Sequence, residues 1–281
     1  YKDGRKVTVY YHKVLEAKLI LGDKIVVSLG TEFIENERSD VSKQDCETKA
    51  AKRLLERIKK EYPRLPICIQ GDAMYATEPM MEICRLNGWK YIFSHKEAQQ
   101  RVLADNYNLL SLEDGKQKVQ GIGAEKGTAI YCNGIGKMAG KTEIMNVYEY
   151  TCKKIIKKQE KTVHFQWITD IELTRRNLEE MVRAGRGRWK IENEGFNNQK
   201  NGIYHIQHLN SRNSNAMKNH YLLTQIADIL MQLYLAWNPI IKEIKQSIKN
   251  TSSRLLESFR RQPVTDEDVH YILRCTTIYL E

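Results

Sequence analysis

Two carboxylates stand in settings that could support metal-dependent chemistry. Asp72 directly follows the apolar run Ile67–Gly71, which predicts a strand whose carboxyl end opens into a site. Glu192 comes four residues after Arg188 in a segment of helical pattern, so their side chains share one helix face. An adjacent arginine favours the charged form of a carboxylate, and Mg²⁺ takes hard oxygen ligands from rigid elements. Taken singly, Asp72 also fits a turn residue and Glu192 a surface ion pair.

An α/β unit is predicted around Asp72, from alternating strand and helix patterns. A helix capped by Asp45 is expected to run to about Tyr62, where Pro63 and Pro66 stop it. A second helix is expected to close at Gly88. The predicted strands are Val7–Tyr11, Leu19–Leu21, Lys24–Leu29, Leu65–Gln70 and Trp89–Ser94, and the second helix is Glu78–Asn87.

Glycine-rich β pattern between about 105 and 170 predicts a mainly β insertion, and helical pattern follows to the end of the chain. The expected strands are Thr128–Cys132, Ile144–Cys152 and Val163–Thr169. The expected helices are Asn177–Arg183, Gly187–Lys200, an apolar and therefore central Ala216–Trp237, and a basic one over Ile240–Arg261. We therefore expect an α/β protein in four segments: 1–104 and 171–237 as two parts of a core, 105–170 as the β insertion, and 238–281 as a helical region.

The charge of the chain favours a polyanionic partner. Forty-five Lys and Arg against 35 Asp and Glu give +10 over 281 residues, with a pI near 9.2. Most of the surplus lies on the helical part, where residues 174–262 hold 15 basic and 7 acidic side chains. Nucleic acid is the expected partner. No apolar run approaches the roughly 20 residues of a membrane span, so we expect a cytoplasmic protein without membrane contact.

Three strings together resemble one family, the DDE insertion-sequence transposases with an RNase H-like catalytic core. The similarity covers nearly the whole chain, including the β insertion between the two carboxylates. The strings are Lys43-Gln44-Asp45-Cys46-Glu47, Gly71-Asp72-Ala73-Met74-Tyr75-Ala76 and Arg188-Trp189-Lys190-Ile191-Glu192-Asn193-Glu194-Gly195-Phe196-Asn197-Asn198-Gln199-Lys200-Asn201-Gly202.

The resemblance implies an enzyme that cleaves transposon ends and transfers the freed strand to target DNA. In the family, three carboxylates hold two Mg²⁺ ions, for which Mn²⁺ can substitute, and these ions clamp the attacking and leaving oxygens of an in-line displacement. By position, Asp72 is the second aspartate and Glu192 the glutamate. Arg188 matches the signature arginine and Lys200 the signature lysine, both as DNA contacts. The resemblance also implies a homodimer on DNA, associated with the nucleoid.

Two departures affect the signature. Gly185 stands where the family has a tyrosine, three residues before Arg188. Lys200 follows Glu192 by eight residues instead of seven. Seven residues return to nearly the same face of an α-helix, while eight leave an angle of about 80°. A local distortion at Gly195 is expected to absorb that mismatch.

The first aspartate of the family has no clear counterpart. Asp3 lies in an apparent turn and Asp23 in a hairpin, and neither ends a first core strand. The chain also begins with Tyr1. We therefore expect an N-terminally truncated transposase that is inactive by itself.

The remaining candidates are weaker. Lys96 follows the predicted strand Trp89–Ser94 and either contacts DNA or is a surface lysine. Trp189 and Phe196 are expected to pack in the core rather than to stack on bases. Two alternatives to a transposase stay open, namely a catalytically inactive DNA-binding remnant and a nuclease of the same fold.

Overall fold

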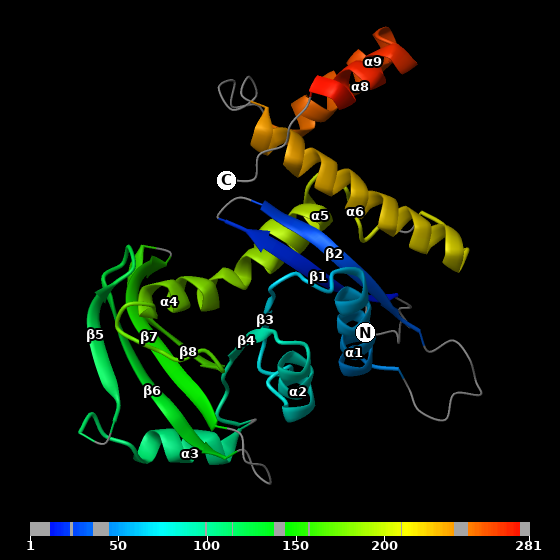
Figure 1. Ribbon diagram of the computed structural model, residues 1–281. Coiled ribbons are helices and arrows are strands. Elements are labelled where there is room, and N and C mark those ends of the chain that lie inside the picture. The colour runs from blue at the N-terminus through cyan, green and yellow to red at the C-terminus, as the bar shows by residue number, and fades with distance from the viewer. Residues whose placement is uncertain are drawn as a thin grey trace, which may run out of the picture. The chain divides into compact units, whose positions relative to one another are not determined.

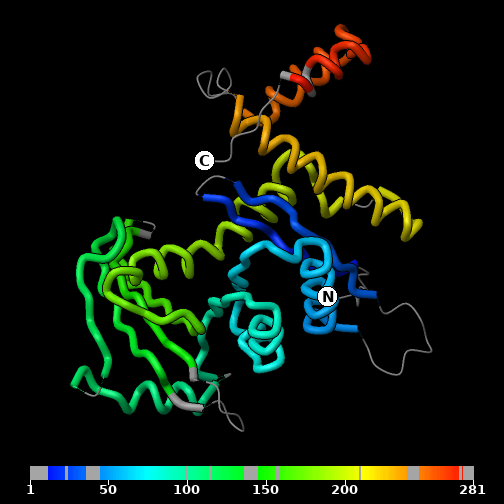
Figure 2. The backbone as a smooth tube through the Cα atoms, viewed as in Figure 1, coloured from blue at the N-terminus to red at the C-terminus, as the bar shows by residue number. Residues whose placement is uncertain are grey.

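The computed structural model describes residues 12–22, 25–35, 45–98, 100–113, 115–137, 144–156, 158–208, 210–238 and 247–275 (Figure 1). The chain forms two compact units, residues 1–195 and residues 196–281. Figure 2 follows the backbone through both.

The first unit begins with a hairpin that packs on a helix. Strands β1 (Lys13–Leu21) and β2 (Ile25–Ile34) pair antiparallel as a two-stranded sheet. Helix α1 (Glu47–Glu61) buries the apolar stripe expected from its 3.6-residue period, and Leu15 and Leu29 of the hairpin pack against the same core. The strand predicted over Val7–Tyr11 lies outside the described residues.

The predicted cap of α1 is wrong. Cys46 is the N-cap, and no side chain makes a capping hydrogen bond. The Asp45 carboxylate instead accepts two hydrogen bonds from the Arg53 guanidinium, at 3.0 and 2.9 Å. Its Oδ1 also accepts the N–H of Cys46 at 3.0 Å. The Asp45 carboxylate is thus held by a bidentate arginine, and it does not accept hydrogen bonds from the N–H groups of the first turn of α1.

Strand β3 (Cys68–Gly71), helix α2 (Glu78–Leu86) and strand β4 (Lys90–Ser94) follow, with β3 parallel to β4. Gly88, with a φ of +68°, follows the C-cap residue Asn87, so α2 closes at this glycine as expected. The strand predicted over Leu65–Gln70 begins three residues later, and it is not fully buried as predicted. The reason is that β3 is the edge of its sheet and pairs, among the described residues, with β4 alone.

Four long antiparallel strands extend that sheet, drawn in green in Figure 1. They are β5 (Gln117–Ile122), β6 (Gly127–Lys137), β7 (Ile144–Ile156) and β8 (Gln159–Thr169), after helix α3 (Arg101–Leu109). The sheet order is β3-β4-β8-β7-β6-β5. The β character expected after residue 105 is present, and these strands continue the sheet of Asp72 because β4 pairs with β8. The boundaries at 104, 170 and 237 stay predictions.

Alternating side chains give this sheet two buried faces. Tyr91 and Phe93 of β4 belong to the core that also holds residues of α1, α2 and α3. Ile92 between them and Trp167 of β8 belong to a second core, together with helix α4 (Leu178–Gly187). The sheet therefore carries helices on both faces, which is an α/β architecture.

In the described part of the second unit lie helices α5 (Asn198–Asn201), α6 (Ser214–Trp237), α8 (Ile248–Arg261) and α9 (Asp266–Cys275). The prediction that α6 is a central apolar helix is wrong. Leu223 and Leu230 are 64% and 62% exposed, while Gln225 and Asp228 are buried. Gln199 donates to these two side chains at 2.9 and 2.8 Å, and these bonds explain why the polar face is inside. No helix among the described residues has both the length and the apolar character needed to cross a membrane.

Candidate active site

Asp72 is the first residue after β3, and its exposed side chain is fixed by a turn. The carboxylate Oδ1 accepts the backbone N–H of Met74 at 2.9 Å. The carbonyl oxygen of Asp72 accepts the N–H of Tyr75 at 3.1 Å. An aspartate that bonds the backbone two residues on is a standard way to fix a turn, so this bond fixes the orientation of the carboxylate.

Gly71 allows that turn to fold back over the strand. A Cβ atom at Gly71 would lie 2.9 Å from Cβ of Tyr75 and 3.2 Å from Cδ1 of Phe93. Both distances are shorter than ordinary contacts, so a larger residue would displace the turn. The glycine before Asp72 is thus a packing requirement.

Lys96 lies at the same end of the sheet as Asp72. Strands β3 and β4 are parallel, and Gly71 pairs with Phe93. The residues that follow the two strands therefore leave the sheet at the same end, the carboxyl end of the strands. Lys96 is exposed. The preceding His95 is buried, and its Nδ1 lies 2.6 Å from Oε1 of Gln166. A buried neighbour therefore fixes the backbone from which Lys96 projects.

Arg188 and Glu192 form the ion pair expected from their spacing. Arg188 Nη1 lies 2.5 Å from Glu192 Oε1, with 30% and 60% of the two side chains exposed. Arg188 caps the end of α4, and Glu192 lies in the π-helix η1 (Ile191–Asn197). The pair places a carboxylate at the surface with its orientation held by an arginine.

The π-helix occupies the segment where a distortion was expected. Each of its turns encloses one residue more than an α-helical turn, and such segments are frequent at functional sites. Gly195 within it is buried, and a Cβ there would lie 3.6 Å from Val26 of β2 and 3.8 Å from the Lys18 side chain of β1. This part of η1 therefore lies against the β1–β2 hairpin.

The glycine that departs from the family pattern is explained by packing. A Cβ atom at Gly185 would lie 2.6 Å from Cε2 of Trp167, a buried residue of β8 in the core that also holds α4. Tyrosine has no room at this position. In this protein, the indole of Trp167 occupies the space next to the helix.

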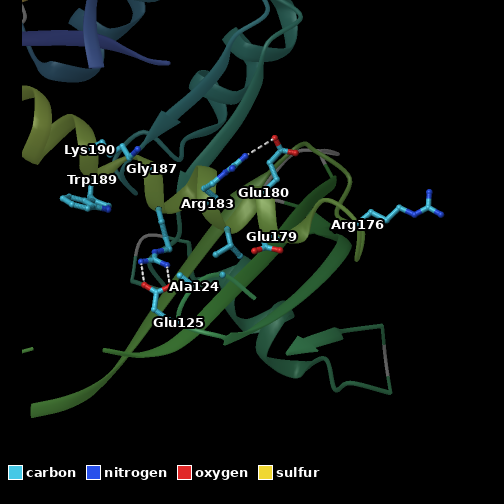
Figure 3. Close-up of a pocket in the computed structure, with 12 residues that line it drawn as sticks. Ala124, Glu125, Arg176, Glu179, Glu180, Arg183, Gly187, Trp189 and Lys190 are labelled. Atoms are coloured by element: carbon cyan, nitrogen blue, oxygen red, sulfur yellow. Dashed lines mark hydrogen bonds and ion pairs between the residues drawn. The ribbon is translucent and has the colours of Figure 1, made fainter. Parts of the chain in front are cut away.

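A half-buried ion pair anchors α4 to the sheet (Figure 3). Arg186 donates two hydrogen bonds to Glu125 in the β5–β6 turn, at 2.8 and 2.7 Å. The arginine also lies 5.7 Å from the ring centroid of Tyr150 and 5.9 Å from that of Phe165. The Arg186 bonds hold the pKa of Glu125 at about 2, below its ordinary value near 4.5. Because Arg186 precedes Arg188 by two residues, this anchor also fixes where the Arg188–Glu192 pair lies.

Trp189 lines a hollow beside this anchor together with Arg183 and Glu179 (Figure 3). Its side chain is 48% exposed, so the prediction that it packs in the core is wrong. The hollow carries side chains of both signs, and Arg183 pairs with Glu180 inside it at 3.8 Å.

Lys200 belongs to the second compact unit, in α5, where it is exposed. Its Nζ lies 5.8 Å from the ring centroid of Phe196. Asp72, Lys96, Arg188 and Glu192 all belong to the first unit. The role of Lys200 stays a prediction.

Comparison with protein families decides the identity. The model of the transposase DDE domain matches residues 25–229, a range that contains Asp72, Arg188 and Glu192. The chain belongs to the transposase DDE domain family. Its α/β architecture is the RNase H-like fold of that family, and membership makes it a DNA transposase, a phosphoryl-transfer enzyme with DNA as its partner. A search of curated proteins found no match.

DDE transposases generally use divalent metal ions, and the transposase has ligands of the right chemical kind. Asp72 and Glu192 are exposed carboxylates, which supply the hard oxygen atoms that Mg²⁺ prefers. Among the residues that the structure describes, no group of three or more His, Cys, Asp and Glu is arranged to hold a metal ion. Asp3 and Asp23, the two weak candidates for the first aspartate, lie outside those residues. The two carboxylates thus fit the role of metal ligands in chemical kind.

Sequence reasoning missed the residues that hold these elements in place. Glu125 and Arg186 are 61 positions apart, and no local pattern pairs them. The contact between Tyr75 and Glu47, which bonds the Asp72 turn to α1, was also missed. Only the string that ends at Glu47 could have signalled it.

Proposed function

We propose that the transposase cleaves the phosphodiester bonds at transposon ends in a Mg²⁺-dependent reaction and joins the freed ends to target DNA. The observation that carries this proposal is the Arg188–Glu192 pair, which lies within the family match and is anchored to the sheet through Arg186. Asp72, in the turn after β3, is the second carboxylate that we assign to the site.

Each side chain has a proposed task. Asp72 and Glu192 would hold the divalent ions, which polarise phosphoryl oxygens and favour attack by water or a hydroxyl group. Arg188 fixes the Glu192 carboxylate through their ion pair and offers its remaining N–H groups to a DNA phosphate. Lys96 and Lys200 are proposed to contact phosphates of the bound DNA.

The proposed reaction has two displacements. In the first, the oxygen of water bonds to phosphorus and the P–O3′ bond at the transposon end breaks. This leaves a 5′-phosphate on the flanking DNA and a 3′-hydroxyl on the transposon, with the proton of water going to solvent and the leaving oxygen gaining one. In the second, the 3′-hydroxyl oxygen bonds to a target phosphorus and a target 3′-hydroxyl leaves. No external energy source is needed, because the first displacement is a favourable hydrolysis and the second replaces one phosphodiester bond by another.

DNA binding is proposed to be largely electrostatic. The surplus of 10 positive charges provides the attraction, so the affinity should fall steeply as salt rises. We also propose that two copies act together on a pair of transposon ends, on the strength of the family resemblance.

The test uses labelled DNA from the two ends of the element, a target duplex, and Mg²⁺ with and without a chelator. We expect metal-dependent nicks at the transposon ends and products joined to the target. Cleavage without joined products would favour the nuclease. DNA binding without any cleavage would favour the inactive remnant.

A further inference from the structure

The Lys43–Glu47 string has no role in the function proposed above, and its last residue contacts the turn of Asp72. Glu47 is the first residue of α1. Its Oε1 accepts a hydrogen bond from the hydroxyl of Tyr75 at 2.7 Å, between residues 28 positions apart. The bond thus connects the start of α1 with a residue three positions after Asp72.

The surroundings of Tyr75 fix the direction of its ring. Its backbone N–H closes the turn onto the Asp72 carbonyl. Its Cβ and Cδ2 lie 2.9 and 3.0 Å from where a side chain at Gly71 would begin. The ring therefore lies over the end of β3, and its hydroxyl reaches across to α1.

The Glu47–Tyr75 bond links elements of the main core to the exposed Asp72, and the Tyr75 side chain itself packs against that core. Helix α1 buries Ala50 and Leu54 in the main core, at 0% and 3% exposure. Asp72 itself is exposed and follows the edge strand of the sheet. The Glu47–Tyr75 bond therefore restrains the turn that carries the Asp72 carboxylate, because it attaches this turn to the buried helix α1. The sheet alone restrains the turn less, since β3 pairs with one neighbouring strand among the described residues.

We propose that Glu47 and Tyr75 are positioning residues for Asp72, and that the Glu47–Tyr75 bond holds its turn in the orientation that metal binding needs. Glu47 acts as a hydrogen-bond acceptor in this role and is not a metal ligand. This inference rests on the proposed function of Asp72. A carboxylate displaced by about 1 Å loses much of its effect in such a site.

The first test measures the turn without metal or DNA. Tyr75→Phe keeps the ring and removes the hydroxyl, Glu47→Ala removes the acceptor, and Glu47→Gln keeps an acceptor oxygen. We expect backbone hydrogen exchange in the peptide around Met74 to become about tenfold faster in Tyr75→Phe and Glu47→Ala, and to stay near wild type in Glu47→Gln. The double variant should be no faster than either single one, because both remove the same bond. Glu56→Ala and Tyr62→Phe, exposed positions on and just after α1, are the matched controls.

The second test measures the Mn²⁺ concentration needed for half-maximal DNA cleavage. We expect it to rise several-fold in Tyr75→Phe and Glu47→Ala and to stay within about twofold of wild type in Glu47→Gln. Unchanged exchange in Tyr75→Phe would overturn the inference. So would a loss in Glu47→Gln as large as in Glu47→Ala, since Glu47 would then act through its charge. If Asp72→Asn left cleavage normal while the exchange results held, the proposed function would fail and the Glu47–Tyr75 bond would remain as a structural contact only.

Discussion

The Glu125–Arg186 pair gives a stability prediction that can be worked out from the structure. The side chains are 24% and 21% exposed, and Lys154 adds a third charge 3.5 Å from Glu125. A pKa of about 2 instead of 4.5 corresponds to roughly 3 kcal/mol at 1.36 kcal/mol per pKa unit. Since both side chains are partly in contact with water, screening reduces this figure to about 1–2 kcal/mol.

We therefore expect Glu125→Gln to lower the free energy of unfolding at pH 7 by about 1–2 kcal/mol. The pKa of Glu125 is lower in the folded protein, so its stabilising effect is full above about pH 4.5 and is lost as the pH falls towards about 2. The difference between wild type and variant should shrink over that range, as measured by urea unfolding at several pH values.

Glu179→Gln is the matched control, because Glu179 lines the same hollow in the first turn of α4. The Glu179→Gln substitution should lower the free energy of unfolding by no more than a few tenths of a kcal/mol. A Glu125→Gln effect that is below about 0.5 kcal/mol, or that does not change between pH 7 and pH 3, would refute the reasoning.

Two further predictions concern packing and DNA binding. Gly185→Ala should lower the free energy of unfolding by about 1–2 kcal/mol, because the clash with Trp167 exceeds the gain of about 1 kcal/mol in helix propensity. A Cβ atom added at Gly187, on the same helix, would meet nothing within 4 Å. Gly187→Ala should therefore leave the free energy of unfolding unchanged or raise it in the same urea titration. Lys96→Ala should weaken binding uniformly across DNA sequences and reduce the slope of log affinity against log salt by about 1. An unchanged salt slope in a filter-binding or anisotropy titration would remove Lys96 from the DNA interface.

The sequence predicts the elements that local patterns specify. Helix α1 has a 3.6-residue apolar stripe, and α2 is closed by Gly88, so both lie close to their predicted positions. The Arg188–Glu192 pair is equally local, because residues four apart on a helix are neighbours.

Features that depend on distant contacts could not be predicted in this way. The start of β3 depends on its pairing with β4, and the edge position of β3 follows from the order of the whole sheet. The polar side of α6 is buried because Gln199 bonds to it from another helix. The sequence shows Gly185 only as a departure from the family motif, because the contact with Trp167 that requires a glycine there joins residues distant in the sequence.

The most direct test of the central assignment compares Asp72→Asn and Glu192→Gln in a metal-dependent DNA cleavage assay, with DNA affinity measured on the same preparations. Asp105→Asn and Glu56→Gln, both at exposed positions on other helices, are the controls. We predict that each site variant loses at least about a hundredfold in cleavage rate while its DNA affinity stays within about threefold of wild type. A cleavage rate equal to that of the controls in either variant would contradict the assignment of that carboxylate.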